Sequence, residues 1–387
     1  MSTTVDLSAI PVVDGHGHPL LPDPSDVSIA TFLDLFSEGR SGTMREHVPH
    51  TGYYRRALRA LAGRLGVEAT TAAVLDGRRR HLGPDTARAQ FAAAGIAALL
   101  VDTGYPADGG MPLDEMRRRL GCAVHEVFRI ETCAERLLVQ RLAYDEFIDA
   151  FRRALLDAAP GCVAFKTIVA YRSGLAVRRW SDDECRASYA RALTAIPAGG
   201  RPRLVDKPLL DRLVETTLEI ARETSRPIQV HSGFGDPDID LLGANPLHLR
   251  PILEDPRWSS VRLVLLHMAY PYTREAAFMT AVWPQVHLDL SLALPFLGAG
   301  AVNPLIEILS LAPASRLMYG SDVSALPELF ALSAEWGRAA LGEALGWLVE
   351  RDGLPPAEAA RMGRAILSDN ARTLYALPEP RDWPSFP

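Results

Sequence analysis

The chain has 387 residues, of which 48% are hydrophobic and 23% charged, and its formal net charge is −6. This length allows a large buried core and fits a single barrel domain with insertions, an architecture that commonly exceeds about 250 residues. The mild negative charge argues against nucleic acid as a partner. No leader precedes the first apolar segment and no apolar run is long enough to cross a bilayer, so we expect a cytoplasmic protein without a membrane partner.

The cysteines give no sign of a metal or disulfide framework. None of the four lies in a CxxC pair or beside a histidine at zinc-ligand spacing. In a chain of this length without a leader, such residues are typically reduced thiols, most of them buried. We therefore expect free thiols at Cys122, Cys133, Cys162 and Cys185.

Eight short apolar runs follow one another along the chain, and each ends in polar residues. Helical patterns separate them, for example over 144–156, 209–224 and 304–311. Strands that alternate with helices predict parallel βαβ units, and eight in succession predict a closed (β/α)8 TIM barrel of the α/β class. The expected strands are 12–13, 96–101, 127–130, 162–165, 227–230, 261–266, 286–288 and 316–319.

Two regions depart from this alternation. Residues from about 22 to 86 contain arginine-rich helical segments and no strand pattern, which predicts a helical insertion after the first strand. The arginine run 78–80 within it is interpreted as a solvated face. Residues from about 356 to 387 form a helical and proline-rich tail. The whole chain, 1–387, is interpreted as one barrel domain with these two additions.

Histidine and aspartate residues stand at several of the expected strand ends. His16 and His18 are separated by one glycine after the first strand, so their side chains project to the same side and can hold one cation. His231, His267 and Asp322 follow three later strands. Each alone is commonly a core or surface residue. Together they supply the three or four nitrogen and oxygen ligands of a catalytic metal site, for which Zn²⁺, Mn²⁺ and Fe²⁺ are the candidates.

The order HxH, Lys, His, His, Asp resembles the amidohydrolase superfamily over nearly the whole chain. Four longer segments, 165–175, 231–236, 245–250 and 267–275, resemble the amidohydrolase domain of FluG- and nodulin-type proteins. Those relatives carry a fused glutamine-synthetase-like domain. This sequence stops where the fusion would begin, so we expect a free-standing version that works with a separate ligase of that kind and forms a homo-oligomer.

The resemblance implies roles for the metal-ligating residues. His16, His18 and His231 would hold a metal ion, with Asp322 as a further ligand or as the base that activates water. His267 would be a ligand of a second metal ion, or an acid–base and oxyanion-stabilising group. The metal would most often be Zn²⁺, with one or two ions per chain.

Lys166 would decide the number of metal ions. The corresponding lysine in some superfamily members is carboxylated and bridges two ions. The alternative is a plain ion pair, for instance with Glu131. Asp322 also has a structural alternative, as the N-cap of the helical segment that begins near Pro327.

The expected substrate is a small anionic molecule. Arg172 is the first candidate anchor, because a guanidinium offers two parallel donors to a carboxylate. Arg129 and Arg250 lie near other expected barrel-mouth segments, and Tyr171 and Glu131 are further candidates for substrate contacts.

The function expected first is hydrolysis of a C–N bond in a carboxylate-bearing amide, with a γ-glutamyl amide suggested by analogy with the fused relatives. Asp322 and His267 would be the catalytic residues. A non-oxidative decarboxylase with one metal ion is the second hypothesis, and release of amine or of CO₂ separates the two. A barrel without catalytic activity that serves as a binding protein is the third.

Overall fold

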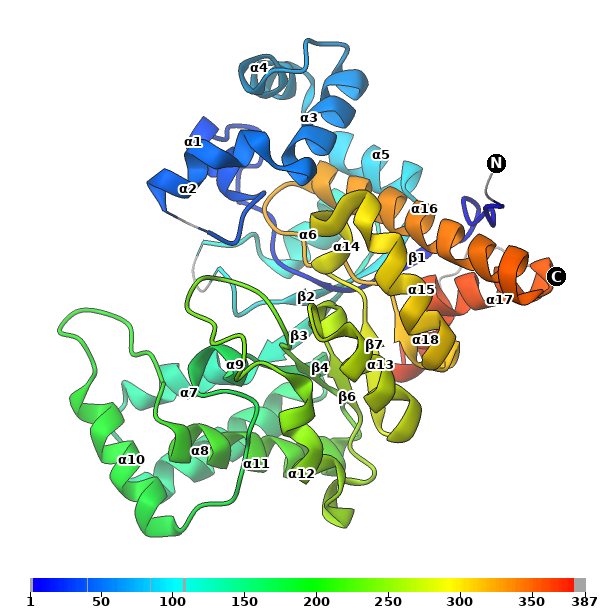
Figure 1. Cartoon of the computed structure of the whole chain (residues 1–387). Coiled ribbons are helices and arrows are strands. Elements are labelled where there is room, and N and C mark those ends of the chain that lie inside the picture. The colour runs from blue at the N-terminus through cyan, green and yellow to red at the C-terminus, as the bar shows by residue number, and fades with distance from the viewer. Residues whose placement is uncertain (1–2, 40, 84, 107–108, 379–387) are drawn as a thin grey trace. The chain divides into compact units, whose positions relative to one another are not determined.

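The computed structural model describes residues 3–39, 41–83, 85–106 and 109–378 (Figure 1). Eight strands form one sheet in the order β1 to β8, and the five strand pairs with a resolved register are all parallel. With helices between the strands, this is the expected (β/α)8 barrel. The strands are β1 (Val12–Gly17), β2 (Ile96–Asp102), β3 (Ala123–Arg129), β4 (Cys162–Thr167), β5 (Ile228–Val230), β6 (Leu263–Leu265), β7 (Val286–Asp289) and β8 (Leu317–Met318).

Eighteen α-helices occur in the described residues. They are α1 (Ile29–Asp34), α2 (Gly42–His47), α3 (Gly52–Leu65), α4 (Thr71–His81), α5 (Thr86–Ala93), α6 (Leu113–Leu120), α7 (Ile130–Leu138), α8 (Tyr144–Ala158), α9 (Val169–Arg172), α10 (Asp182–Thr194), α11 (Lys207–Thr224), α12 (Arg250–Leu253), α13 (Thr273–Val282), α14 (Ala293–Leu297), α15 (Val302–Leu311), α16 (Pro327–Asp352), α17 (Pro356–Arg364) and α18 (Asn370–Leu374). Short 3₁₀ segments are η1 (Val48–His50), η2 (Pro246–Leu249), η3 (Pro256–Trp258), η4 (His267–Ala269), η5 (Gly298–Ala301) and η6 (Ala314–Arg316), and η7 (Ala365–Asp369) is a π-helix.

Each expected strand has its counterpart, with shifts at the ends. The first strand is longer than expected and includes Asp14, Gly15 and His16. The third begins earlier, at Ala123, and Ile130 already belongs to α7, so Glu131 lies in the first turn of a helix instead of at a strand end. The expected helices 144–156, 209–224 and 304–311 are α8, α11 and α15.

The contacts within the chain divide it into two compact units. Unit 1 contains Met1–Val101, Gly109–His125 and Leu290–Pro387, and unit 2 contains Asp102–Asp108 and Glu126–Asp289. Each has an apolar core. Phe32, Phe91 and Phe330 are fully buried in unit 1, and Phe147 and Phe165 are fully buried in unit 2. The four cysteines are free, three of them buried, as expected.

The region between β1 and β2 is helical, as the sequence predicts for residues 22–86. It holds α1 to α5 and η1, and no strand occurs in its described residues (residues 40 and 84 lie outside them). An aromatic cluster in unit 1 connects this insertion with α14 and α16. The ring of Tyr53 on α3 lies 4.9 Å from that of Phe296 and 6.2 Å from that of Trp336.

Arg78 corrects the interpretation of the arginine run as a solvated face. It is 1% exposed and forms an ion pair with Glu328, also 1% exposed, in the first turn of α16. Its Nη2 donates to the carbonyl of Pro24 at 2.8 Å. Arg79 and Arg80, which pair with Asp76, do lie on the surface. The buried pair ties α4 to α16, the long orange helix in Figure 1.

One stretch, Ala293–Leu311, is apolar enough and long enough to cross a membrane, contrary to the sequence-based expectation. In the structure this stretch is divided among α14, η5 and α15. Leu305, Ile308 and Leu309 are buried, and α14 and α15 both pack against α16. The same composition occurs in helices that cover the core of a folded domain, so the stretch is weak support for a membrane span. Of the C-terminal tail, residues 379–387 lie outside the described residues.

We expect Arg78→Met to lower the free energy of unfolding by about 3–5 kcal/mol, because it leaves the buried Glu328 carboxylate without its cation. Arg79→Met is the matched control, since the Arg79 side chain is 48% exposed and a surface ion pair contributes about 1 kcal/mol or less. Urea denaturation of the two variants checks the difference. Equal urea midpoints for the two variants would show that the buried ion pair does not stabilise the packing of the insertion against α16.

Candidate functional site

The end of β1 presents two histidines to one side. His16 is fully buried and His18 is 8% exposed. Gly17 between them is required by packing, because a Cβ there would lie 2.8 Å from the ring of Phe330 and 3.3 Å from the carbonyl oxygen of Val323. The glycine therefore lets the strand approach α16 closely while both imidazoles keep their common direction.

Asp322 meets this pair in unit 1. Its Oδ1 lies 3.0 Å from Nε2 of His16 and 3.2 Å from Nε2 of His18. Its backbone N–H donates to the His16 carbonyl at 2.7 Å, and its φ is +59°. Asp322 does not cap α16, whose N-cap is Leu326. These contacts place the end of the eighth strand beside the first, as the closed barrel predicted from the sequence requires.

These three side chains fit a divalent metal ion. Ligands about 2.0–2.1 Å from a tetrahedral ion lie about 3.3 Å from one another, close to the two oxygen–nitrogen distances here. Neutral imidazole nitrogen and carboxylate oxygen are the donors that Zn²⁺, Mn²⁺ and Fe²⁺ accept. Ligand atoms of His16 and His18 also lie within 4.8 Å of each other.

Asp14 positions this group and was missed in the sequence analysis as a candidate. It is fully buried, and its Oδ1 accepts a hydrogen bond from the Ser321 backbone N–H at 2.8 Å. The same oxygen lies 3.4 Å from the backbone nitrogen of His16. Asp14 thus holds the residue before Asp322 against β1. Its place two residues before His16, on the same strand face, was the available signal.

Unit 2 contains a second pair of buried histidines. Nε2 of His267 lies 3.0 Å from Nδ1 of His231, and the Tyr171 ring lies 4.3 Å from that of His231. His267, Met268 and Ala269 all have positive φ, between +47° and +66°. Gly233 makes this turn possible, because a Cβ there would lie 2.2 Å from the Tyr270 carbonyl oxygen. Strained backbone of this kind is concentrated at functional sites.

Lys166 and Glu131 are both 1% exposed in unit 2. The Glu131 carboxylate does not form the ion pair with Lys166 that was one alternative. Its Oε1 accepts from the Thr167 hydroxyl at 2.6 Å and from the Ile168 backbone N–H at 2.9 Å. Burial raises the pKa of Glu131, and the hydrogen bond from Thr167 opposes that rise.

The three candidate arginines have different surroundings. Arg129 donates to Asp102, with Nη2 2.5 Å from Oδ2. Its Nε also donates to Asp102, so both parallel donors of the guanidinium are already bound within the protein. Arg250 is on the surface, its side chain 64% exposed and paired with Glu254. Arg172 is 10% exposed. Its Nη2 lies 3.3 Å from Oε1 of Glu135, and its Nε and Nη1 have no partner among the described residues.

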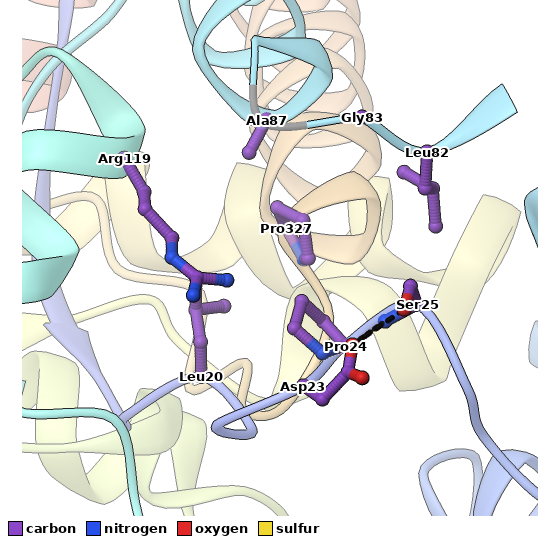
Figure 2. Close-up of a pocket in the computed structure, with 9 residues that line it drawn as sticks. All are labelled: Leu20, Asp23, Pro24, Ser25, Leu82, Gly83, Ala87, Arg119 and Pro327. Carbon is purple, nitrogen blue, oxygen red and sulfur yellow. Dashed lines mark hydrogen bonds between the residues drawn. The ribbon is translucent and has the colours of Figure 1, made fainter.

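A separate pocket of about 280 Å³ lies in unit 1 beside the chain segments that follow β1 and precede α16 (Figure 2). The guanidinium of Arg119 points into it, and Asp23 accepts a hydrogen bond from the Ser25 backbone N–H at 3.0 Å. Its walls are mostly apolar and carry none of the candidate ligands. They are formed by Leu20, Asp23, Pro24, Ser25, Leu82, Gly83, Ala87, Arg119 and Pro327.

A (β/α)8 barrel with histidines and an aspartate at its strand ends belongs to the class of barrel proteins whose chemistry lies at that end of the strands. The family model for amidohydrolases matches residues 155–377, more than half of the chain. The chain therefore belongs to the amidohydrolase family, as the resemblance indicated.

Individual relatives agree with this family. The chain is 29% identical to protein FluG of Emericella nidulans over 95% of its own length and spans about half (46%) of that longer protein. A crystal structure from Lactobacillus casei, described as a metal-dependent hydrolase, is 28% identical with a TM-score of 0.86 and covers 96% of this chain and 98% of that one. A uronate isomerase from Thermotoga maritima, 14% identical with a TM-score of 0.69 and 95% of each chain covered, shares the fold.

We expect the double substitution His16→Ala with His18→Ala to abolish binding of Zn²⁺, because it removes two of the three candidate ligands of unit 1. Elemental analysis after dialysis checks this result. The surface variant His248→Ala is the control and should keep the wild-type metal content. Unchanged zinc in the double variant would rule out this ligand assignment. The wild-type ratio, one or two ions per chain, also tests the bridging role of Lys166.

Proposed function

We propose that the protein is a metal-dependent hydrolase that cleaves the C–N bond of a small, carboxylate-bearing amide, with a γ-glutamyl amide as the first candidate substrate. The observation that carries this proposal is the position of the Asp322 carboxylate, 3.0 and 3.2 Å from the two imidazoles of the HxH motif. Family membership and the description of the Lactobacillus casei protein support it.

In this proposal the two groups of histidines serve one metal centre. His16, His18 and Asp322 come from unit 1, and His231 and His267 come from unit 2. Support comes from the order of the sheet, in which the strands follow one another from β1 to β8. In parallel barrels the carboxyl ends of all strands open at one mouth. Lys166 on β4 would join as a carboxylated bridge if two ions are bound.

A metal ion held there would lower the pKa of a water ligand and polarise the scissile carbonyl. Asp322 would accept the proton of the attacking water and deliver it to the leaving amine. The backbone hydrogen bond from Asp322 to His16 holds the carboxylate in place for both transfers. His267 would donate to the carbonyl oxygen as its negative charge develops, or act as a further ligand.

Arg172 would anchor the carboxylate of the substrate. A charged guanidinium that is 10% exposed needs hydrogen-bond acceptors for its N–H groups, and Glu135 supplies one for Nη2 only. Nε and Nη1 are left without partners among the described residues, so a carboxylate would complete their hydrogen bonds. Tyr171 precedes Arg172 on the short helix α9, and its ring packs against that of His231. Helix α9 therefore lies beside a proposed metal ligand.

The direct experiment is an assay of the zinc-loaded protein with a γ-glutamyl anilide, which tests for amide hydrolysis. In parallel, an aryl carboxylic acid tests for decarboxylation. Release of aniline at a rate that depends on enzyme and metal supports the hydrolase. Release of CO₂ without amine would contradict it and favour the decarboxylase. Absence of both activities in metal-loaded protein would favour a binding barrel.

We expect Asp322→Asn to lower kcat by about 100-fold or more, because the amide keeps the size of the carboxylate but cannot accept the proton. Zinc content should be measured on the same sample, to separate loss of the base from loss of the ion. Asp76→Asn, at a position whose side chain is 54% exposed, is the control with wild-type kcat. An Asp322→Asn protein with full zinc and full turnover would remove Asp322 from the mechanism.

We expect Arg172→Lys to raise KM more than it lowers kcat. Lysine keeps the charge but loses the planar fork that binds a carboxylate through two hydrogen bonds, and such binding contributes equally to ground and transition states. Steady-state kinetics with the anilide check the split. Arg152→Lys, on the surface of the same unit, should leave both constants unchanged. An unaltered KM in Arg172→Lys would assign Arg172 to the structural pair with Glu135.

A further inference from the structure

Two adjacent tyrosines on α3 of the insertion differ in what their hydroxyls bind. Tyr53 is 6% exposed and Tyr54 is 2% exposed. The Tyr54 hydroxyl forms a hydrogen bond with the Thr71 hydroxyl on α4. The Tyr53 hydroxyl forms none with any residue that the structure describes. Tyr54 therefore has a structural role that is complete within the insertion, whereas the Tyr53 phenol has no hydrogen-bond partner among the described residues.

The ring of Tyr53 is fixed on several sides. It meets Phe36 edge-on at 5.0 Å, Phe296 at 4.9 Å and Trp336 edge-on at 6.2 Å. Such contacts favour an aromatic ring but make no use of its oxygen, so phenylalanine would fill this place equally well. The Tyr53 oxygen is not among the enclosed side-chain atoms of the described residues that lack a partner. The ring contacts do not account for the hydroxyl, and a group that enters the site can accept its hydrogen bond.

The surroundings of this ring lead to Asp322. Phe296 belongs to α14, and the segment just before α14 is held to the β8 side, because the Leu292 N–H donates to the Ser321 carbonyl at 3.2 Å. Ser321 directly precedes Asp322. Burial raises the pKa of the Tyr53 phenol, and the charges of Glu38 and Asp322 raise it further. The phenol therefore stays protonated at neutral pH and can act as a donor.

We propose that the Tyr53 hydroxyl donates a hydrogen bond to an oxygen of the substrate held beside Asp322, and so positions the scissile amide for attack. This inference rests on the proposed function, because it assumes that the substrate lies at Asp322. It makes the helical insertion a part of the active site, although the insertion supplies none of the metal ligands. Tyr53 is then a substrate-positioning residue of a kind that the strand-end pattern does not reveal.

The test compares Tyr53→Phe with Tyr54→Phe in the full-length, zinc-loaded protein. Each change removes one oxygen atom from neighbouring buried rings of the same helix. For Tyr53→Phe we expect kcat/KM for the γ-glutamyl anilide to fall by about 10-fold or more, as for one lost substrate hydrogen bond, with zinc content and Tm unchanged. For Tyr54→Phe we expect a lower Tm and kcat/KM within about two-fold of wild type, since only an internal hydrogen bond is lost.

A binding measurement separates this inference from the proposed function. L-glutamate, the acid product of the candidate substrate, is titrated into each protein by calorimetry, and its affinity should fall about 10-fold in Tyr53→Phe only. Failure of the wild type to cleave any amide would contradict the proposed function, and the glutamate titration alone would then decide the role of Tyr53. Equal glutamate affinity in Tyr53→Phe and wild type, or no binding to either, would overturn the inference. A fall in Tm in Tyr53→Phe equal to that in Tyr54→Phe, with kcat/KM retained, would also overturn it.

Discussion

The hydrogen bonds between β1 and the chain after β8 are the constraint on which the candidate site depends. The His16 carbonyl accepts from the N–H groups of both Ser321 and Asp322, and the same Ser321 N–H also donates to the Asp14 carboxylate. These bonds join segments that are about 300 residues apart in the sequence. They fix the Asp322 carboxylate against the two imidazoles of His16 and His18. Preorganisation of this kind is what a metal site and a general base both require.

The insertion is fastened to the same unit by contacts of a different type. The Arg78–Glu328 pair joins α4 to the first turn of α16, and the aromatic cluster joins α3 to α14 and α16. A buried ion pair adds little net stability over apolar side chains of similar size, yet it is costly to break and defines one arrangement. The orientation of Tyr53 therefore depends on both contacts, although neither involves a metal ligand.

The sequence was sufficient for the barrel and for the common direction of His16 and His18, because both follow from short-range regularities. Alternation of strands and helices predicts parallel units, and the i, i+2 spacing of His16 and His18 gives a common direction. What it could not supply were the partners of individual polar groups. Arg129 is taken up by Asp102, and Arg250 lies on the surface. Such pairings depend on which distant side chains meet, and no local pattern encodes them.

The two adjacent tyrosines of α3 also limit how this insertion can change. Successive residues on an α-helix point about 100° apart. The Tyr54 hydroxyl can therefore bond to Thr71 on α4 while the Tyr53 ring packs against Phe296. Deleting or adding one residue early in α3 would rotate the rest of the helix by that angle, so neither tyrosine would keep its present direction. Segments outside a barrel usually tolerate changes of length well. Here we expect insertions and deletions within α3 to come in steps of whole helical turns, which keep the direction of both tyrosines. Other changes of length would fall in the loops on either side of α3.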